Sequence, residues 1–115
     1  MLSIAVIVLI LSYASTQETE NASGRRGGRQ LLRSGTSVGA NYRAACRARS
    51  SADFVSKMGI VEEEADESIY WMDLLVDSGS VSADKVDALR REANELLAIT
   101  VSSIKTARVA KDRTN

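Results

Sequence analysis

The chain has 115 residues, with 15 Lys and Arg against 15 Asp and Glu, no His, no Pro and one Cys. This length suits one domain, and the absence of Pro suits long uninterrupted helices. A single Cys cannot form an internal disulfide, and without His the usual zinc sites and the Glu-x-x-His di-iron scheme are excluded. The composition therefore indicates a small helical domain, which we expect in the reducing cytoplasm.

Residues 1–14 are almost entirely apolar, but a membrane-spanning helix needs roughly 20 residues. We predict a short first helix over residues 2–14 and expect no membrane partner. A secretory signal peptide is the alternative, because residues 12–14 would give a small-residue cleavage site. Residues 15–28 are polar and rich in Gly, which predicts a linker.

Residues 51–77 carry an apolar row whose members lie three or four positions apart. This spacing places the row along one side of an α-helix. Ser50 is its predicted N-cap, and Gly79 is predicted to adopt a left-handed conformation just after it. The row consists of Phe54, Met58, Val61, Ala65, Ser68, Met72 and Leu75, and Ile60, Trp71 and Leu74 widen it.

The same spacing predicts helices over residues 29–47 and 83–112. With the short first helix, the fold class is therefore all-α: a single domain over residues 1–115, forming an antiparallel up-down-up-down four-helix bundle. The apolar row of the earlier helix is Leu31, Gly35, Val38, Tyr42 and Ala45, and that of the last helix is Val86, Leu89, Ala93, Leu96, Thr100, Ile104 and Ala107.

Charge is strongly segregated along the chain. Residues 21–52 contain no acid, whereas residues 62–67 are mostly acidic. Guanidinium groups bind phosphate oxygens, so Arg on one side of the predicted helix 29–47 indicate a nucleic-acid surface. The alternative is that they pair with residues 62–67 of a neighbouring helix or subunit. The candidate binding residues are Arg29, Arg33, Arg43 and Arg47.

A second row on the same helix is polar and small. Ser34, Ser37 and Asn41 are predicted to make interhelical hydrogen bonds that fix the helix register, with Arg33 or Glu64 as the partner. Because no His is present to act as a base, we expect no catalytic residues and no enzyme activity. We interpret residues 62–67 as a solvated acidic face rather than a Mg²⁺ or Mn²⁺ site, and expect no metal or cofactor. Cys46 is interpreted as a small packing residue.

Residues 29–41 (RQLLRSGTSVGAN), 51–54 (SADF) and 60–68 (IVEEEADES) closely resemble a bacterial four-helix-bundle family. That family is named for open reading frames inside intervening sequences of 23S ribosomal RNA genes. The resemblance is strong over residues 29–75. It implies antiparallel four-helix subunits assembled as a ring-like homopentamer. It also implies a relation to the accessory variability protein of diversity-generating retroelements, a basic pentamer that engages RNA and a reverse transcriptase.

Two functions follow from these patterns. The first is a non-catalytic oligomer that binds RNA or a nucleoprotein partner through its Arg-rich helix. The second is a purely structural protein–protein interaction module without nucleic-acid binding, which the zero net charge favours.

Overall fold

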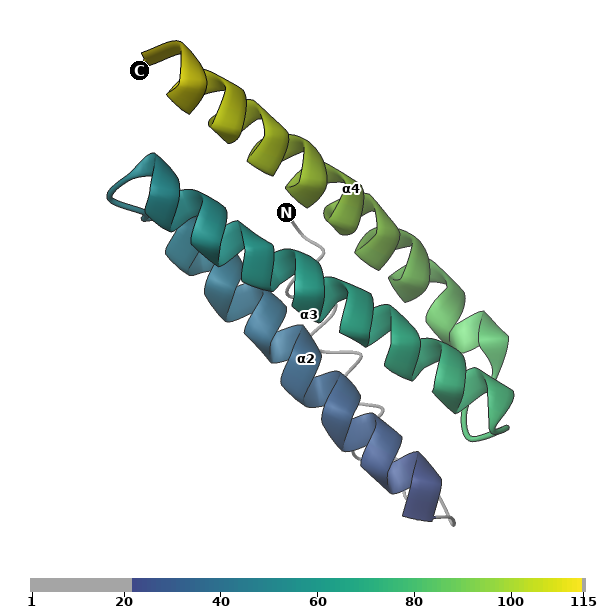
Figure 1. Cartoon of the computed structure of the whole chain (residues 1–115). Coiled ribbons are helices and arrows are strands. Elements are labelled where there is room, and N and C mark those ends of the chain that lie inside the picture. The colour runs from purple at the N-terminus through teal and green to yellow at the C-terminus, as the bar shows by residue number, and fades with distance from the viewer. Residues whose placement is uncertain (1–21, 115) are drawn as a thin grey trace.

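The computed structural model describes residues 22–114, and these residues form three α-helices joined by two short connections (Figure 1). The helices are α2 (Ala22–Cys46), α3 (Ser51–Asp77) and α4 (Ala83–Thr114). α3 contacts both α2 and α4, and consecutive helices run antiparallel. The all-α class is confirmed. The described residues give three of the four predicted bundle helices, because the predicted helix over residues 2–14 lies outside them.

α2 begins at Ala22, so the prediction of a linker up to residue 28 is wrong for residues 22–28; residues 15–21 lie outside the described part. Gly27 is buried, and a Cβ atom on it would lie 2.9 Å from Cδ2 of Leu75 and 4.0 Å from Cε3 of Trp71. Glycine thus lets α2 approach α3 closely. This packing outweighs the low helix propensity of glycine, which costs about 1 kcal/mol relative to Ala.

Both predicted ends of α3 are confirmed. The Ser50 side chain accepts a hydrogen bond from the Asp53 backbone N–H at 3.0 Å, as an N-cap does. At the other end, Gly79 has a φ of 76°. The backbone N–H of Ser80 donates to the Leu75 carbonyl at 3.0 Å, and that of Gly79 donates to the Val76 carbonyl at 3.0 Å. These two bonds form a Schellman motif, which turns the chain toward α4.

The core follows the predicted rows with few exceptions. Phe54, Tyr42 and Ala107 are only partly buried. The other members of the three rows are buried, including the polar Ser68 and Thr100. The apolar row therefore identified the buried side of every described helix.

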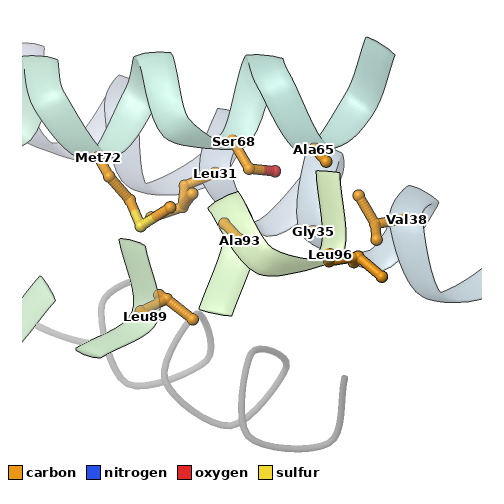
Figure 2. A pocket seen from close by; sticks show the side chains of 9 residues that line it. All are labelled: Leu31, Gly35, Val38, Ala65, Ser68, Met72, Leu89, Ala93 and Leu96. Atoms are coloured by element: carbon orange, nitrogen blue, oxygen red, sulfur yellow. The ribbon is translucent and has the colours of Figure 1, made fainter. Parts of the chain in front are cut away.

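A small cavity of about 10 Å³ lies where the three described helices meet (Figure 2). This is close to the smallest volume that holds one water molecule. The cavity exists because small side chains from each helix converge there among larger ones. It is lined by Leu31, Gly35, Val38, Ala65, Ser68, Met72, Leu89, Ala93 and Leu96.

Candidate nucleic-acid interface

The exposed side of α2 carries the predicted basic row. Arg29, Arg33 and Arg43 are exposed on the helix, and Arg47 is exposed directly after its last residue. Among residues 22–114, no carboxylate oxygen lies within 4.0 Å of a guanidinium nitrogen of Arg29, Arg43 or Arg47. Three of the four predicted residues therefore present their charge to solvent.

Arg33 differs from the other three because it forms ion pairs with α3. Its Nη1 atom lies 3.3 Å from Oε2 of Glu64, and its Nη2 atom donates to Oε1 of Glu67. Its Nε atom also donates to Oε1 of Gln30 at 3.2 Å. Arg33 therefore joins α2 to α3 and is the member of the row least available to a ligand.

The hydrogen bond from Arg33, supported by one from Trp71 Nε1 at 3.2 Å, lowers the pKa of the Glu67 carboxyl group below its usual range. The hydrogen bonds to Glu67 and Glu64 raise the pKa of Arg33. Both changes favour the charged forms. The pair is therefore fully ionised at neutral pH.

The predicted polar residues divide into separate groups. The Ser68 hydroxyl donates to the Ser34 hydroxyl oxygen at 2.8 Å across the α2–α3 contact, and the Ser34 hydroxyl donates to the Leu31 carbonyl at 3.2 Å. Asn41 instead donates to Ser37 of its own helix, to the carbonyl at 2.9 Å and to the hydroxyl at 3.1 Å. The structure thus places Ser34 between helices and Ser37 and Asn41 within one helix. The Glu64 side chain forms an ion pair with Arg33 and does not join the Ser34–Ser68 hydrogen bond.

Two further arginines extend the basic row toward the start of α2. Arg25 and Arg26 are exposed and, with Arg29 and Gln30, line a hollow on the surface. The prediction of a linker up to residue 28 placed them outside the helix. The signal that could have found them is spacing. Arg25 lies four residues before Arg29 and Arg26 lies three residues before it, and residues at these spacings are neighbours on a helix surface.

Trp71 of α3 packs beside this part of α2, although it is distant from it in the sequence, and Tyr70 is its neighbour. The rings of Tyr70 and Trp71 meet edge to face with centroids 5.1 Å apart. Trp71 packs toward Gly27 and donates to Glu67, the partner of Arg33. Tyr70 is 57% exposed. Trp71 therefore belongs to the α2–α3 contact, whereas Tyr70 presents its ring to solvent on α3.

The interpretation of Cys46 as a packing residue is wrong. Cys46 is the last residue of α2 and is exposed, because the adjacent Ala45 occupies the buried position. Within residues 22–114, no group of three or more His, Cys, Asp or Glu side chains is placed to hold a metal ion. In the same part of the chain, none of the helices has the length and apolar composition needed to cross a membrane.

These features define a class: a small antiparallel helical protein with a basic helix packed beside an acidic one. The chain belongs to the family described as 23S rRNA-intervening sequence protein, whose model matches residues 4–102. The predicted family resemblance is thereby confirmed, whereas the relation to the retroelement protein stays a prediction.

A solved structure supports the same relationship. The chain is similar to a protein of unknown function from the S23 ribosomal protein family of Bacteroides thetaiotaomicron VPI-5482, with a TM-score of 0.76 and 32% sequence identity. The similarity covers 89% of this chain and 91% of that chain. No curated protein sequence matches this chain.

Proposed function

We propose that this protein is a non-catalytic, oligomeric helical-bundle protein of the bacterial cytoplasm that binds RNA, alone or within a nucleoprotein, through the basic side of α2. The observation that carries the proposal is the exposed row of Arg29, Arg43 and Arg47, which lacks carboxylate partners among the described residues. Arg25 and Arg26 lengthen this row. Clustered arginines attract the phosphate backbone without regard to base sequence. The expected relation of this family to the retroelement accessory protein points the same way.

The proposal that the protein is not an enzyme is supported by the burial of Ser34 and by the lack of a histidine base. Ser34 is completely buried and its hydroxyl proton is directed to the Leu31 carbonyl. A serine nucleophile needs an accessible oxygen and an adjacent base. The chain contains no His that could act as this base.

The proposed assembly is a ring of five subunits. Apolar side chains on the outer side of α3 support an interface, because Ile60 is 36% exposed and Leu74 is 42% exposed. Exposed apolar groups along one side of a helix favour burial between subunits. In light scattering coupled to size exclusion, the wild type should have the mass of five chains. Leu74→Asp should reduce this mass while leaving the helical circular dichroism signal intact, and a monomeric wild type at micromolar concentration would contradict the assembly.

RNA binding is tested by fluorescence anisotropy with a labelled single-stranded RNA at several salt concentrations. Affinity should fall steeply between about 50 and 200 mM salt, because binding releases counterions. The double variant Arg43→Gln/Arg47→Gln should weaken binding without changing helicity. Arg91→Gln/Arg108→Gln removes the same charge from exposed positions on α4 and should have little effect. Equal losses in the two double variants would show only non-specific attraction and would count against the α2 surface.

The alternative function is a structural interaction module without nucleic-acid binding. It is favoured by one observation, namely that Arg33 is already paired with Glu64 and Glu67. A protein that assembles but does not retain RNA even at low salt would support this alternative.

A further inference from the structure

The hollow at the start of the basic row has features of a specific anion site. Arg25, Arg26, Arg29 and Gln30 line it, and its volume is about 380 Å³. Small-ligand sites usually have volumes of roughly 300–1,000 Å³. None of the described residues that line it is acidic. The hollow therefore offers room and positive charge in the same place.

The positive charges in the hollow are close neighbours along the helix. Arg26 and Arg29 are three residues apart on α2, so their side chains emerge from adjacent turns. In the described part of the chain, neither has a carboxylate oxygen within 4.0 Å of its guanidinium nitrogens. Like charges at this spacing destabilise a helix. A bound anion would remove this repulsion.

Gln30 adds a neutral donor whose orientation is fixed from α3. Its Oε1 atom accepts a hydrogen bond from Arg33 Nε at 3.2 Å, and Arg33 is itself held by Glu64 and Glu67. The Gln30 oxygen is thereby occupied. The Gln30 Nε2 group has no hydrogen-bond partner among residues 22–114 and remains available as a donor.

We propose that this hollow is a phosphate-binding site in which Arg26 and Arg29 are the charged ligands, Gln30 Nε2 is a neutral donor, and Arg33 is a positioning residue. Guanidinium groups present paired N–H donors that match phosphate oxygens. This proposal rests on the proposed RNA binding, because the ligand that we expect is a phosphate group of an RNA chain. Free inorganic phosphate is the second source of the same chemistry.

The first experiment uses inorganic phosphate alone. It is titrated into the full chain at low salt, and the Nε–Hε signals of the arginines are followed by NMR. We expect saturable shifts and a loss of affinity of about tenfold or more in Arg26→Gln/Arg29→Gln, since hydrogen bonds to charged groups are the strong ones. Arg43→Gln/Arg47→Gln removes the same charge from the same basic row and should change the affinity less than about twofold. Shifts that do not saturate, or equal losses in both double variants, would overturn the site.

The second experiment separates the two sources of phosphate and separates this proposal from the proposed function. One single-stranded RNA is prepared with a 5′-hydroxyl group and with a 5′-phosphate group, and both are titrated by anisotropy. Weaker binding of both forms by Arg26→Gln/Arg29→Gln supports a backbone phosphate as the ligand, and loss confined to the 5′-phosphate form supports a terminal phosphate. Phosphate binding without RNA binding would contradict the proposed function but keep the site. RNA binding that Arg26→Gln/Arg29→Gln leaves unchanged would overturn the site and keep the function.

The positioning role of Arg33 has its own readout. If Arg33 acts only by orienting Gln30, then Gln30→Ala and Arg33→Gln should weaken phosphate binding by similar factors, and the double variant should be no weaker than either. Additive losses would show that Arg33 binds phosphate directly and would overturn this role. Circular dichroism of each variant checks that α2 stays helical.

Discussion

The two contacts of α3 bury different chemistry. Toward α2, small side chains lie among apolar ones such as Leu31: Gly27 leaves room for Leu75, and the hydroxyl groups of Ser34 and Ser68 meet in the interior. Toward α4, large aliphatic side chains such as Leu89 and Leu96 fill the space. The first contact depends on close approach and matched hydrogen bonds, whereas the second depends mainly on apolar area. One helix therefore packs against its neighbours in two physically distinct ways.

The largest effect should come from a charge placed where the two contacts meet. Leu75 is 3% exposed and belongs to the cluster that also contains residues of α2 and α4. Leu75→Asp would bury an unpaired carboxylate and should abolish the folded state, whereas Leu75→Ala should cost about 2–5 kcal/mol. Circular dichroism and urea unfolding measure these changes. The control is Ile99→Asp, a variant that should stay helical because Ile99 is 52% exposed. An unchanged melting temperature in Leu75→Asp would contradict the assignment of Leu75 to the core.

A side chain added at Gly27 tests the closeness of the α2 contact. Gly27→Val should destabilise the protein by about 1–3 kcal/mol, because even a Cβ atom would lie 2.9 Å from Leu75 Cδ2. Gly59, on α3, is the matched control, since a Cβ atom there would meet nothing within 4 Å. Gly59→Ala should stabilise the protein by roughly 0.5–1 kcal/mol through helix propensity alone. Stabilisation by both substitutions would mean that α2 does not pack closely against α3.

The buried hydroxyl pair should contribute less than the packing at Gly27. Ser34→Ala leaves Ser68 with a second acceptor, the Glu64 carbonyl at 2.8 Å, and Ser68→Ala leaves the Ser34 hydroxyl bonded to the Leu31 carbonyl. Neither change strands a buried polar group, so each should cost about 0.5–1.5 kcal/mol in urea unfolding. The control is Ser102→Ala on the exposed side of α4, which should have almost no effect. A loss as large as that of Leu75→Ala would show that the pair organises the whole contact.

The same comparison explains how much the sequence could predict. Apolar spacing identified the buried sides of all three described helices. Buried residues such as Val61 and Leu89 recur every three or four positions, and this pattern is visible in the local sequence. It misplaced the start of α2, because the helical state of Gly27 depends on Leu75, which is distant in the sequence. The four basic residues were predicted as a row. Only Arg33 of the row has a carboxylate partner among the described residues, and this depends on which carboxylates α3 brings close. A periodic pattern in the sequence does not show which side chains of two helices come into contact.

The smallest predicted effect concerns the ion pair of Arg33, and its sign follows from the pKa of Glu67. Hydrogen bonding to Arg33 lowers this pKa in the folded protein below the ordinary value of about 4.3. The pair therefore stabilises the folded state above that ordinary pKa, and its contribution disappears as the pH falls through the lowered folded-state pKa. Arg33→Gln should reduce the melting temperature slightly at pH 7 and by less at about pH 2, because acid protonates Glu67 and removes the charge that Arg33 pairs with.

The exposure of the Arg33 side chain, at 48%, keeps this effect small, and 1 M NaCl should reduce it further. Arg43→Gln is the matched control, because it removes the same charge from α2 at a position without a carboxylate partner among the described residues. Its effect on the melting temperature should not depend on pH in this acidic range. If Arg33→Gln instead lowered the melting temperature equally at both pH values, Arg33 would stabilise the α2–α3 contact through the packing of its aliphatic stem rather than through charge.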